Sequence, residues 1–150
     1  MSRKARRAAW CAVVFFFALA CAFLLLLPQW LDKPLLFAGA QRYTFFSGSA
    51  SSQARITVAT PEEAPFVRLT LQGYTGESAY YPSAEDAFAQ AEAYGAALLL
   101  VQRSADVTDY YYYSAQLEGG VVLSCGLVNL HVAVRAGGGV VGSPLIFGGY

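Results

Sequence analysis

The stretch VNLHVAVR, residues 128–135, places an apolar branched side chain at every second position. Alternation with a period of two predicts a β-strand that buries one face, as in an antiparallel sheet covered on one side. Gly137, Gly138 and Gly139 then favour a hairpin turn, and residues 140–147 are expected to form the returning strand. Because Pro144 cannot donate to a strand ladder, we expect this strand at an edge of the sheet or bulged at the proline.

Segments upstream of this hairpin extend the same sheet. Period-two alternation, or enrichment in aromatic and branched residues, predicts further strands at residues 42–46, 56–58, 67–71, 77–81, 96–101, 110–113 and 121–123. In the second of these, Ile56 and Val58 are expected to face the core. Leu98, Leu99 and Leu100 form a continuous apolar run, which favours a buried strand.

One helix is predicted within this folded region, at residues 83–94. Ser83 can cap the first free amides, while Glu85 and Asp86 complement the positive end of the helix dipole. Gly95 stands where a left-handed cap ends a helix. One face of the helix carries three apolar residues, Ala84, Phe88 and Ala91. The sequence therefore predicts an α+β domain at residues 42–150, an antiparallel sheet covered by one helix.

A long uncharged stretch lies near the N-terminus, where residues 8–27 read AAWCAVVFFFALACAFLLLL. About 20 apolar residues are enough for a helix to cross the core of a bilayer. Trp10 and Trp30 lie about 30 Å apart along such a helix, which places one indole ring at each membrane face. An excess of cations before the stretch predicts a cytoplasmic N-terminus, and these cations are Arg3, Lys4, Arg6 and Arg7.

This pattern divides the chain into four predicted parts. They are a basic cytoplasmic tail at 1–7, a transmembrane signal anchor at 8–31, a juxtamembrane linker at 32–41 and an extracytoplasmic domain at 42–150. Signal peptides have apolar cores of about 7–15 residues, with a small-residue cleavage site close behind. Ala38, Gly39 and Ala40 are small enough but lie far beyond Leu27, so we expect an uncleaved, single-pass anchor in the lipid bilayer. Release of a secreted domain after Ala40 stays open as an alternative.

The charge and cysteine content of the folded region argue against several functions. From Gln41 onward the chain has five cations and nine anions, a net charge of −4. Nonspecific nucleic-acid binding needs a basic surface, so no nucleic-acid partner is expected. Cys11 and Cys21 lie in the uncharged stretch, which leaves Cys125 as the one cysteine of the domain and, we expect, a buried free thiol. The paired ligand spacing of zinc sites is missing, and we expect neither a metal nor a cofactor.

His131 is the only histidine, and it limits the catalytic possibilities. On a continuous strand, Cys125 and His131 would be about 20 Å apart, far beyond hydrogen-bond reach. We therefore expect His131 to face solvent beside Asn129 and Arg135 on the polar side of its strand. The alternative is an envelope enzyme that uses His131 with a nearby carboxylate, or with Cys125 after a chain reversal at Gly126.

The tyrosines indicate a binding surface more clearly than any catalytic motif does. All ten lie outside the uncharged stretch, and four of them are consecutive. Four consecutive tyrosines in a strand point two rings to each face of the sheet, and exposed aromatic rings suit contacts with proteins or glycans. The alternative is that the tyrosines fill cross-strand pairs at the periphery of the sheet. The expected surface for an envelope protein or glycan comprises Tyr110, Tyr111, Tyr112, Tyr113, Asn129, His131 and Arg135.

The C-terminal sequence also resembles a known family. Residues 128–135, followed by Gly142, Ser143, Pro144, Leu145 and Ile146, resemble the C-terminal end of the YwmB-like proteins of spore-forming Gram-positive bacteria. That family is labelled TATA-box-binding-protein-like for its predicted fold. The resemblance implies an N-terminal signal or anchor and a setting in cell-wall or sporulation functions, and it brings no catalytic motif. We therefore expect a non-enzymatic, membrane-anchored bacterial protein that acts by binding or assembly outside the cytoplasm.

Overall fold

The structure is a computed structural model that describes the backbone of residues 3–31 and 33–148, and the side chains of residues 10–25 and 33–148. The chain divides into two compact units, residues 1–33 and 34–150, and each is described by itself. The first unit is a single helix, α1 (Arg3–Leu31), which confirms the helical prediction for residues 8–27. The predicted anchor residues Arg3, Lys4, Arg6, Arg7 and Trp30 have side chains outside the described residues.

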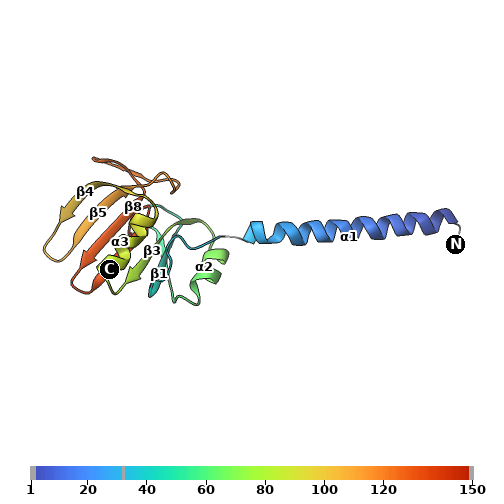
Figure 1. The fold of residues 1–150 in the computed structure, drawn as a ribbon, viewed down its shortest axis with the longest axis horizontal. Coiled ribbons are helices and arrows are strands. Elements are labelled where there is room, and N and C mark those ends of the chain that lie inside the picture. The colour runs from blue at the N-terminus through green and yellow to red at the C-terminus, as the bar shows by residue number, and fades with distance from the viewer. Residues whose placement is uncertain (1–2, 32, 149–150) are drawn as a thin grey trace. The chain divides into compact units, whose positions relative to one another are not determined.

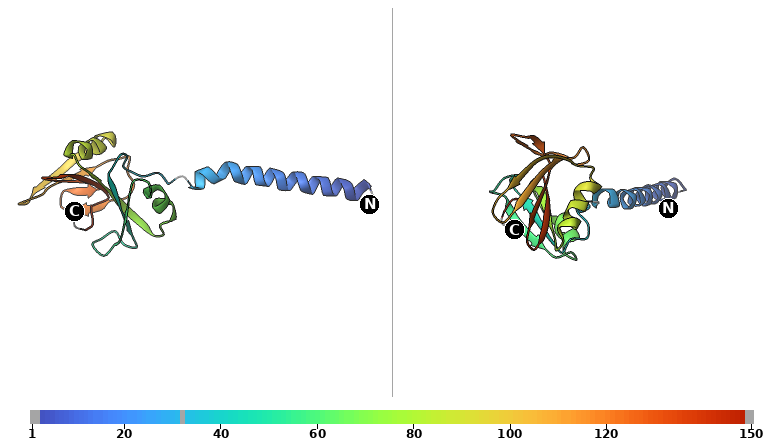
Figure 2. Two further views of the ribbon diagram at one scale, coloured as in Figure 1. Left: turned by 90° about the horizontal axis from the view of Figure 1, so that it is seen from below. Right: turned by 60° about the vertical axis from the view of Figure 1, so that its left-hand side comes forward.

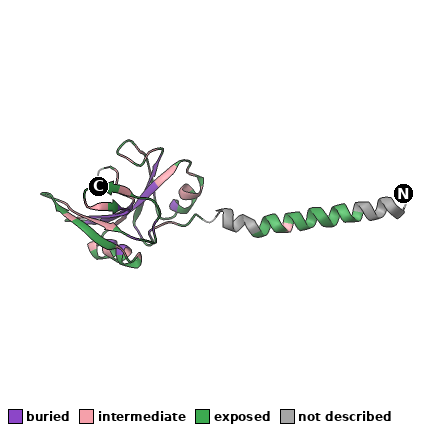
Figure 3. Ribbon diagram, turned by 90° about the horizontal axis from the view of Figure 1, so that it is seen from above, coloured by how far each residue is buried: buried purple, intermediate pink, exposed green. Residues whose placement is uncertain are grey.

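Helix α1 leaves its apolar side chains open to the surroundings. From Trp10 to Leu25 every side chain is exposed except that of Cys21, which is half-buried (Figure 3). Within the part of the chain that the structure describes, no helix combines the length and hydropathy of a membrane span.

The second unit is built on one antiparallel sheet of seven strands (Figure 1). In spatial order these strands are β2 (Arg55–Ala59), β1 (Arg42–Ser47), β3 (Tyr74–Tyr81), β9 (Gly138–Ser143), β8 (Leu130–Arg135), β5 (Thr108–Tyr113) and β4 (Ala97–Arg103). Two short strands, β6 (Val121–Leu123) and β7 (Gly126–Val128), form a separate hairpin. Helices α2 (Ala64–Thr70) and α3 (Ala84–Ala93) complete the unit, so the predicted α+β class with an antiparallel sheet is confirmed.

Helix α3 covers the middle of one sheet face, where it packs on β9, β8 and β3 (Figure 2). Its predicted start is confirmed, because the Ser83 hydroxyl accepts the backbone N–H of Glu85 at 3.1 Å. Ala87 and Ala91 are buried beneath the helix. Gly139 of β9 lets the helix approach, since a Cβ atom there would lie 2.7 Å from the Cβ of Ala87. Small residues on both elements therefore bring α3 close to the sheet.

The predicted β8–β9 hairpin is confirmed, but the expected place of its second strand is wrong. Strand β9 lies between β3 and β8 in the middle of the sheet, and it ends at Ser143. Pro144 follows the strand and thus removes no donor from the ladder. Residues 144–148, here called the C-terminal segment, continue across the sheet face opposite α3, where the backbone N–H of Ile146 bonds the side chain of His131.

The predicted strand at residues 67–71 is also wrong, because these residues belong largely to helix α2. Pro65 lies in the first turn of the helix, where its fixed φ angle favours helical structure. Before it, Thr60 and Glu63 bond each other's backbone N–H groups, the Glu63 carboxylate accepting at 3.2 Å and the Thr60 hydroxyl at 3.4 Å. This reciprocal pair has the hydrogen-bond pattern of a capping box and closes the turn directly before the helix.

Two further expectations about burial fail at the edges of the sheet. Val58 is the partner of Thr44 in the register and shares its face, opposite α3, where Ile56 and Val58 are 49% and 59% exposed. Strand β4 is the other edge strand, and Leu98, Leu99 and Leu100 are exposed instead of buried. Helix α3 packs on β9, β8 and β3, so it does not cover the outer strand β4, and Ile56 and Val58 lie on the opposite face of the sheet.

Residues 35–40, here called the docked segment, are packed into the core on the α3 side. Phe37 is fully buried, and its ring meets that of Tyr94 edge to face at 6.2 Å. Tyrosine hydroxyls from separate elements donate to its backbone carbonyls: Tyr43 to Phe37 at 2.9 Å, Tyr81 to Ala38 at 2.7 Å and Tyr94 to Leu36 at 2.5 Å. The apolar residues Leu35, Leu36 and Phe37 thus pack onto the domain.

A buried carboxylate also binds the backbone of the docked segment. Glu77 of β3 is fully buried and accepts the backbone N–H of Leu36 at 2.6 Å. It also accepts the hydroxyl of Tyr74 at 3.1 Å and lies 3.6 Å from the Arg68 guanidinium. Burial raises the pKa of Glu77, although these three partners each favour its charged form.

Candidate functional site

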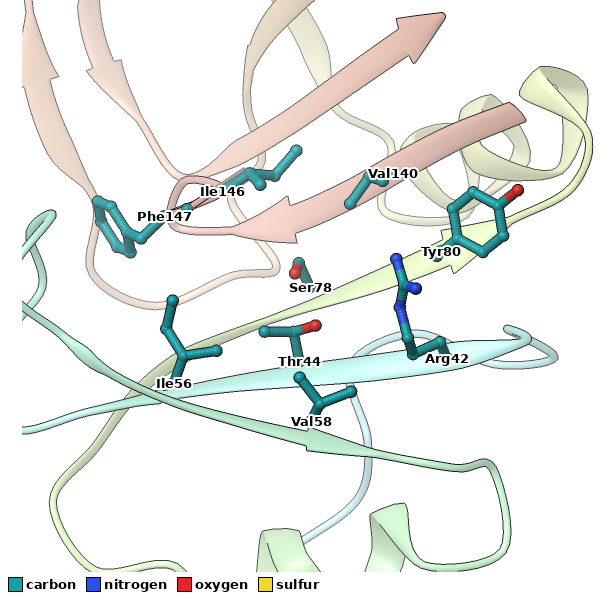
Figure 4. Close-up of a pocket in the computed structure, with 10 residues that line it drawn as sticks. Arg42, Thr44, Ile56, Val58, Ser78, Tyr80, Val140, Ile146 and Phe147 are labelled. Carbon is teal, nitrogen blue, oxygen red and sulfur yellow. The ribbon is translucent and has the colours of Figure 1, made fainter. Parts of the chain in front are cut away.

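A groove of about 280 Å³ lies on the sheet face opposite α3 (Figure 4). Alternate residues of three neighbouring strands line it, because side chains two apart in a strand share a face. These are Arg42 and Thr44 of β1, Ile56 and Val58 of β2, and Ser78 and Tyr80 of β3, joined by Val140 of β9 and by Ile146, Phe147 and Gly148. We call this cavity the sheet groove.

The sheet groove changes in chemistry from one end to the other. Figure 4 shows Ile56 and Phe147 toward one end, Arg42 and Tyr80 toward the other, and the hydroxyl groups of Thr44 and Ser78 between them. Thr44 and Ser78 are direct partners in the β1–β3 register, which places their hydroxyls side by side. An apolar end, a hydroxyl floor and a cationic end therefore follow one another along the groove.

Among the residues that the structure describes, Arg42 is the only charged one that lines the sheet groove. Its guanidinium carbon lies 5.2 Å from the centre of the Tyr80 ring, and the Tyr80 hydroxyl donates to the backbone carbonyl of Gly137 at 2.8 Å. Among residues 33–148, which carry described side chains, no carboxylate is ion-paired with Arg42. Contact with an aromatic face orients the guanidinium without using its N–H donors.

The C-terminal segment forms the second wall of the sheet groove, and aromatic packing fixes its end. The ring of Phe147 meets that of Phe46 edge to face at 5.3 Å. Gly148 follows, and a Cβ atom there would lie 3.0 Å from Ile56. The C-terminal segment thus packs against Phe46 of β1 and Ile56 of β2.

His131 of β8 ties the C-terminal segment to the sheet. Its Nδ1 atom accepts the backbone N–H of Ile146 at 3.3 Å, and its Nε2 atom lies 2.9 Å from the Asp109 carboxylate. Tyr111 stacks on the imidazole with ring centres 4.6 Å apart. Because Nδ1 accepts, the neutral ring carries its proton on Nε2 and donates it to Asp109. Burial lowers the pKa of His131, and the Asp109 carboxylate offsets this only in part.

The structure corrects the predicted exposed surface at two positions. His131 does not face solvent, because the C-terminal segment and Tyr111 cover it and it is 5% exposed. Asn129 is fully buried, where its side chain accepts the Ser114 N–H and donates to the Ser114 and Leu117 carbonyls. These bonds satisfy a polar side chain within the fold, so neither residue belongs to an exposed binding surface.

The four consecutive tyrosines divide between the two faces of the sheet, as predicted. On one face Tyr110 packs edge to face on Phe88 of α3, with ring centres 4.9 Å apart, and on the other Tyr111 stacks on His131. Tyr110, Tyr111 and Tyr112 are half-buried, while Tyr113 is exposed. Of the seven residues of the predicted surface, Tyr113 and Arg135 are thus the exposed ones.

Cys125 is a free cysteine, and it is half-buried instead of buried. It lies in the turn between β6 and β7, outside the main sheet. Both ring nitrogens of His131 are occupied by Asp109 and Ile146. The reversal at Gly126 therefore does not produce a cysteine–histidine dyad.

Comparisons with models of protein families, with curated proteins and with solved structures find no match to this chain. The function must accordingly be inferred from the chemistry of the chain itself. Sequence reasoning missed most residues of the sheet groove, because only the strand pairings bring Arg42 opposite Tyr80.

Proposed function

We propose that this chain is a membrane-anchored, non-enzymatic binding protein whose extracytoplasmic α+β domain holds a ligand in the sheet groove. The observation that carries the proposal is the exposure of Ile56 and Val58 in a concave site beside Arg42. Ligand pockets combine apolar walls with a few well-placed polar groups, and the sheet groove has this composition.

The proposed location is supported by the sequence of the first unit. Residues 8–27 carry no charge and follow four cations, the pattern of a signal anchor with a cytoplasmic N-terminus. Helix α1 runs through this stretch, and exposed apolar side chains at consecutive positions from Trp10 to Ala20 surround it on all sides. A helix that is apolar all round needs an apolar environment.

The docked segment supports an uncleaved chain over release after Ala40. Cleavage there would remove Phe37 from the core and leave the Glu77 carboxylate without the N–H of Leu36. Buried groups that lose their partners destabilise a fold strongly. A domain built in this way is best preserved when the docked segment stays attached.

The second candidate is the envelope enzyme, and the hydrogen bond between His131 and Asp109 favours it. The geometry is that of a histidine oriented by a carboxylate. However, the Nδ1 atom that a substrate would need accepts the backbone N–H of Ile146, and the ring is buried under Tyr111. We therefore assign His131 a structural role as the support of a groove wall.

An envelope or sporulation setting, with an envelope protein or glycan as partner, follows from the C-terminal resemblance and belongs to the same proposal. In that setting the ligand of the sheet groove reaches the domain from outside the membrane. The acidic charge of the domain gives no reason to extend the proposal to DNA.

The test uses the full chain in lipid nanodiscs with labelled methyl groups and indole as a neutral, soluble apolar probe. We expect indole to shift the methyl resonances of Ile56, Val58 and Val140, while those of the equally exposed Leu98 stay unchanged. Val58→Asn should weaken this binding, and Leu98→Asn should leave it intact. Equal shifts at Leu98, or none in the groove, would contradict a binding role for the groove.

The proposed location has its own test. A bacterial cell that expresses the chain with a C-terminal tag should retain the intact polypeptide in membranes washed with carbonate. Protease added outside the cytoplasmic membrane should remove the tag. Recovery of the intact chain in the soluble fraction would refute the anchor without affecting the groove.

A further inference from the structure

We infer that the ligand of the sheet groove is a small amphipathic carboxylate, bound with its charged head at Arg42 and its apolar body toward Ile56 and Phe147. The inference rests on the proposed binding function and adds the chemical class and the orientation of the ligand. It follows from the order of side chains along the groove that Figure 4 shows.

The charge distribution selects an anion. The chain from Gln41 onward has a net charge of −4, yet none of the described residues that line the sheet groove is acidic. Arg42 is the single charged residue there, and among the described side chains no carboxylate neutralises it. A guanidinium whose planar donors are free of a protein carboxylate matches an incoming carboxylate in geometry as well as in charge.

The neighbouring cavity determines how the ligand is oriented. Beyond Arg42 a second space is lined by Val58, Thr60 and Glu63 together with Arg42 itself. The Glu63 carboxylate repels an anion that extends into this second space. On the other side of Arg42, the sheet groove is lined by apolar side chains and two hydroxyl groups. The charged head is therefore placed at Arg42, and the rest of the ligand lies over Thr44 and Ser78.

The apolar end accommodates a short hydrocarbon or aromatic body. Ile56 and Val58 are about half exposed, so a ligand that covers them removes apolar surface from water. Phe147 is held edge-on by Phe46 and faces them from the other wall. A volume of about 280 Å³ lies just below the usual range for ligand pockets and suits a small, singly charged molecule.

The experiment compares three probes of equal length and different head groups: hexanoate, hexanol and hexylamine. Each is titrated into the full chain in neutral phosphatidylcholine nanodiscs, with the methyl resonances of Ile56, Val58 and Val140 as the readout. We expect hexanoate to bind at least tenfold more tightly than hexylamine, with hexanol between them. Each probe has six carbons, but the alkyl chain of hexanoate is one methylene shorter than those of hexanol and hexylamine. Tighter binding of hexanoate must therefore come from its head group.

Substitution of the arginine isolates its role. Arg42→Gln should reduce hexanoate binding to the level of hexanol, and Arg42→Lys should retain part of it, since a lysine keeps the charge but loses the planar pair of donors. Arg103→Gln is the matched control, because Arg103 is an exposed arginine of the sheet outside the groove. Unchanged methyl spectra elsewhere confirm that each variant is folded.

The outcomes separate this inference from the proposed function. If indole shifts the groove methyls but the three probes bind alike and Arg42→Gln has no effect, the carboxylate inference is wrong and the binding groove stands. If indole and all three probes leave the groove methyls unchanged, both fail. If nanodiscs that contain phosphatidylserine shift the groove methyls through Arg42 and block hexanoate, the ligand is a membrane lipid and the inference of a small soluble carboxylate is overturned.

Discussion

The imidazole of His131 accepts the backbone N–H of Ile146 at 3.3 Å, and this bond joins the central sheet to the segment that walls the sheet groove. The bond needs Nδ1 to carry no proton, because a protonated imidazole has two donors and no acceptor. Protonation of one buried side chain would therefore loosen one wall of the proposed ligand site.

The first prediction is a loss of stability on mild acidification. Burial lowers the pKa of His131 below its ordinary value of 6.5, so the unfolded chain takes up this proton more readily than the folded one. The stabilising effect is complete above pH 6.5 and is lost as the pH falls from 6.5 toward the lower folded value. Urea denaturation of the full chain in micelles between pH 7.5 and 5 should show the midpoint falling with pH.

The control for this prediction is His131→Gln, which cannot titrate in that range. The variant should be less stable at pH 7.5 by about 1 kcal/mol, the usual net contribution of one hydrogen bond. Glu77 acts in the opposite direction, because its raised pKa makes stability fall as the pH rises from 4.5. A pH dependence that is the same in wild type and variant would assign the effect to groups other than His131.

The second prediction concerns the docked segment. Phe37→Ala should destabilise the domain by about 3–5 kcal/mol, the usual cost of removing a fully buried phenylalanine ring. Phe66→Ala is the matched control, since Phe66 is 69% exposed on α2 and should change stability by about 0.5 kcal/mol or less. Chemical denaturation measures both, and similar losses would show that the docked segment contributes little.

Local patterns predicted the elements that depend on neighbouring residues. The alternation in β8, the three glycines after it and the Ser83 cap of α3 each act within a few residues, and all three are found in the structure. Helix α2 could also have been predicted, because Thr60 and Glu63 have the spacing of a capping box and Pro65 stands in the first turn.

The sheet groove depends on distant pairings and could not be predicted in the same way. Strand β1 pairs with β2 and β3, and only this arrangement brings Thr44 between Val58 and Ser78. His131 bonds Asp109 and Ile146, which lie 22 and 15 positions away in the sequence. A single sequence shows that His131 is on the polar side of its strand, but not that another segment covers that side.

The third prediction tests the buried carboxylate. Glu77→Gln keeps the shape of the side chain but removes the charge that faces the largely buried Arg68 guanidinium. Because burial raises the pKa of Glu77, loss of the charge alone costs little, but an amide offers one acceptor oxygen in place of two. Either the Leu36 N–H or the Tyr74 hydroxyl then loses its acceptor, and an unsatisfied buried donor costs about 1–3 kcal/mol. Glu92→Gln on the exposed face of α3 is the control and should be nearly neutral. Equal stability of the two variants in urea would contradict a structural role for Glu77.

The fourth prediction concerns the contact between α3 and the sheet. An alanine at Gly139 would place its Cβ 2.7 Å from Ala87 and 3.3 Å from the backbone of Ala84, so α3 must move away from β9. We expect Gly139→Ala to lower stability by about 1–3 kcal/mol, the usual cost of overpacking. Gly137→Ala is the matched control two residues away, because a Cβ there meets no atom within 4 Å.

Since α3 and the sheet groove lie on opposite faces of β9, hexanoate binding at Arg42 should survive the Gly139→Ala substitution at any urea concentration where the domain remains folded. Loss of that binding from the folded variant would instead show that the two faces of the sheet are coupled.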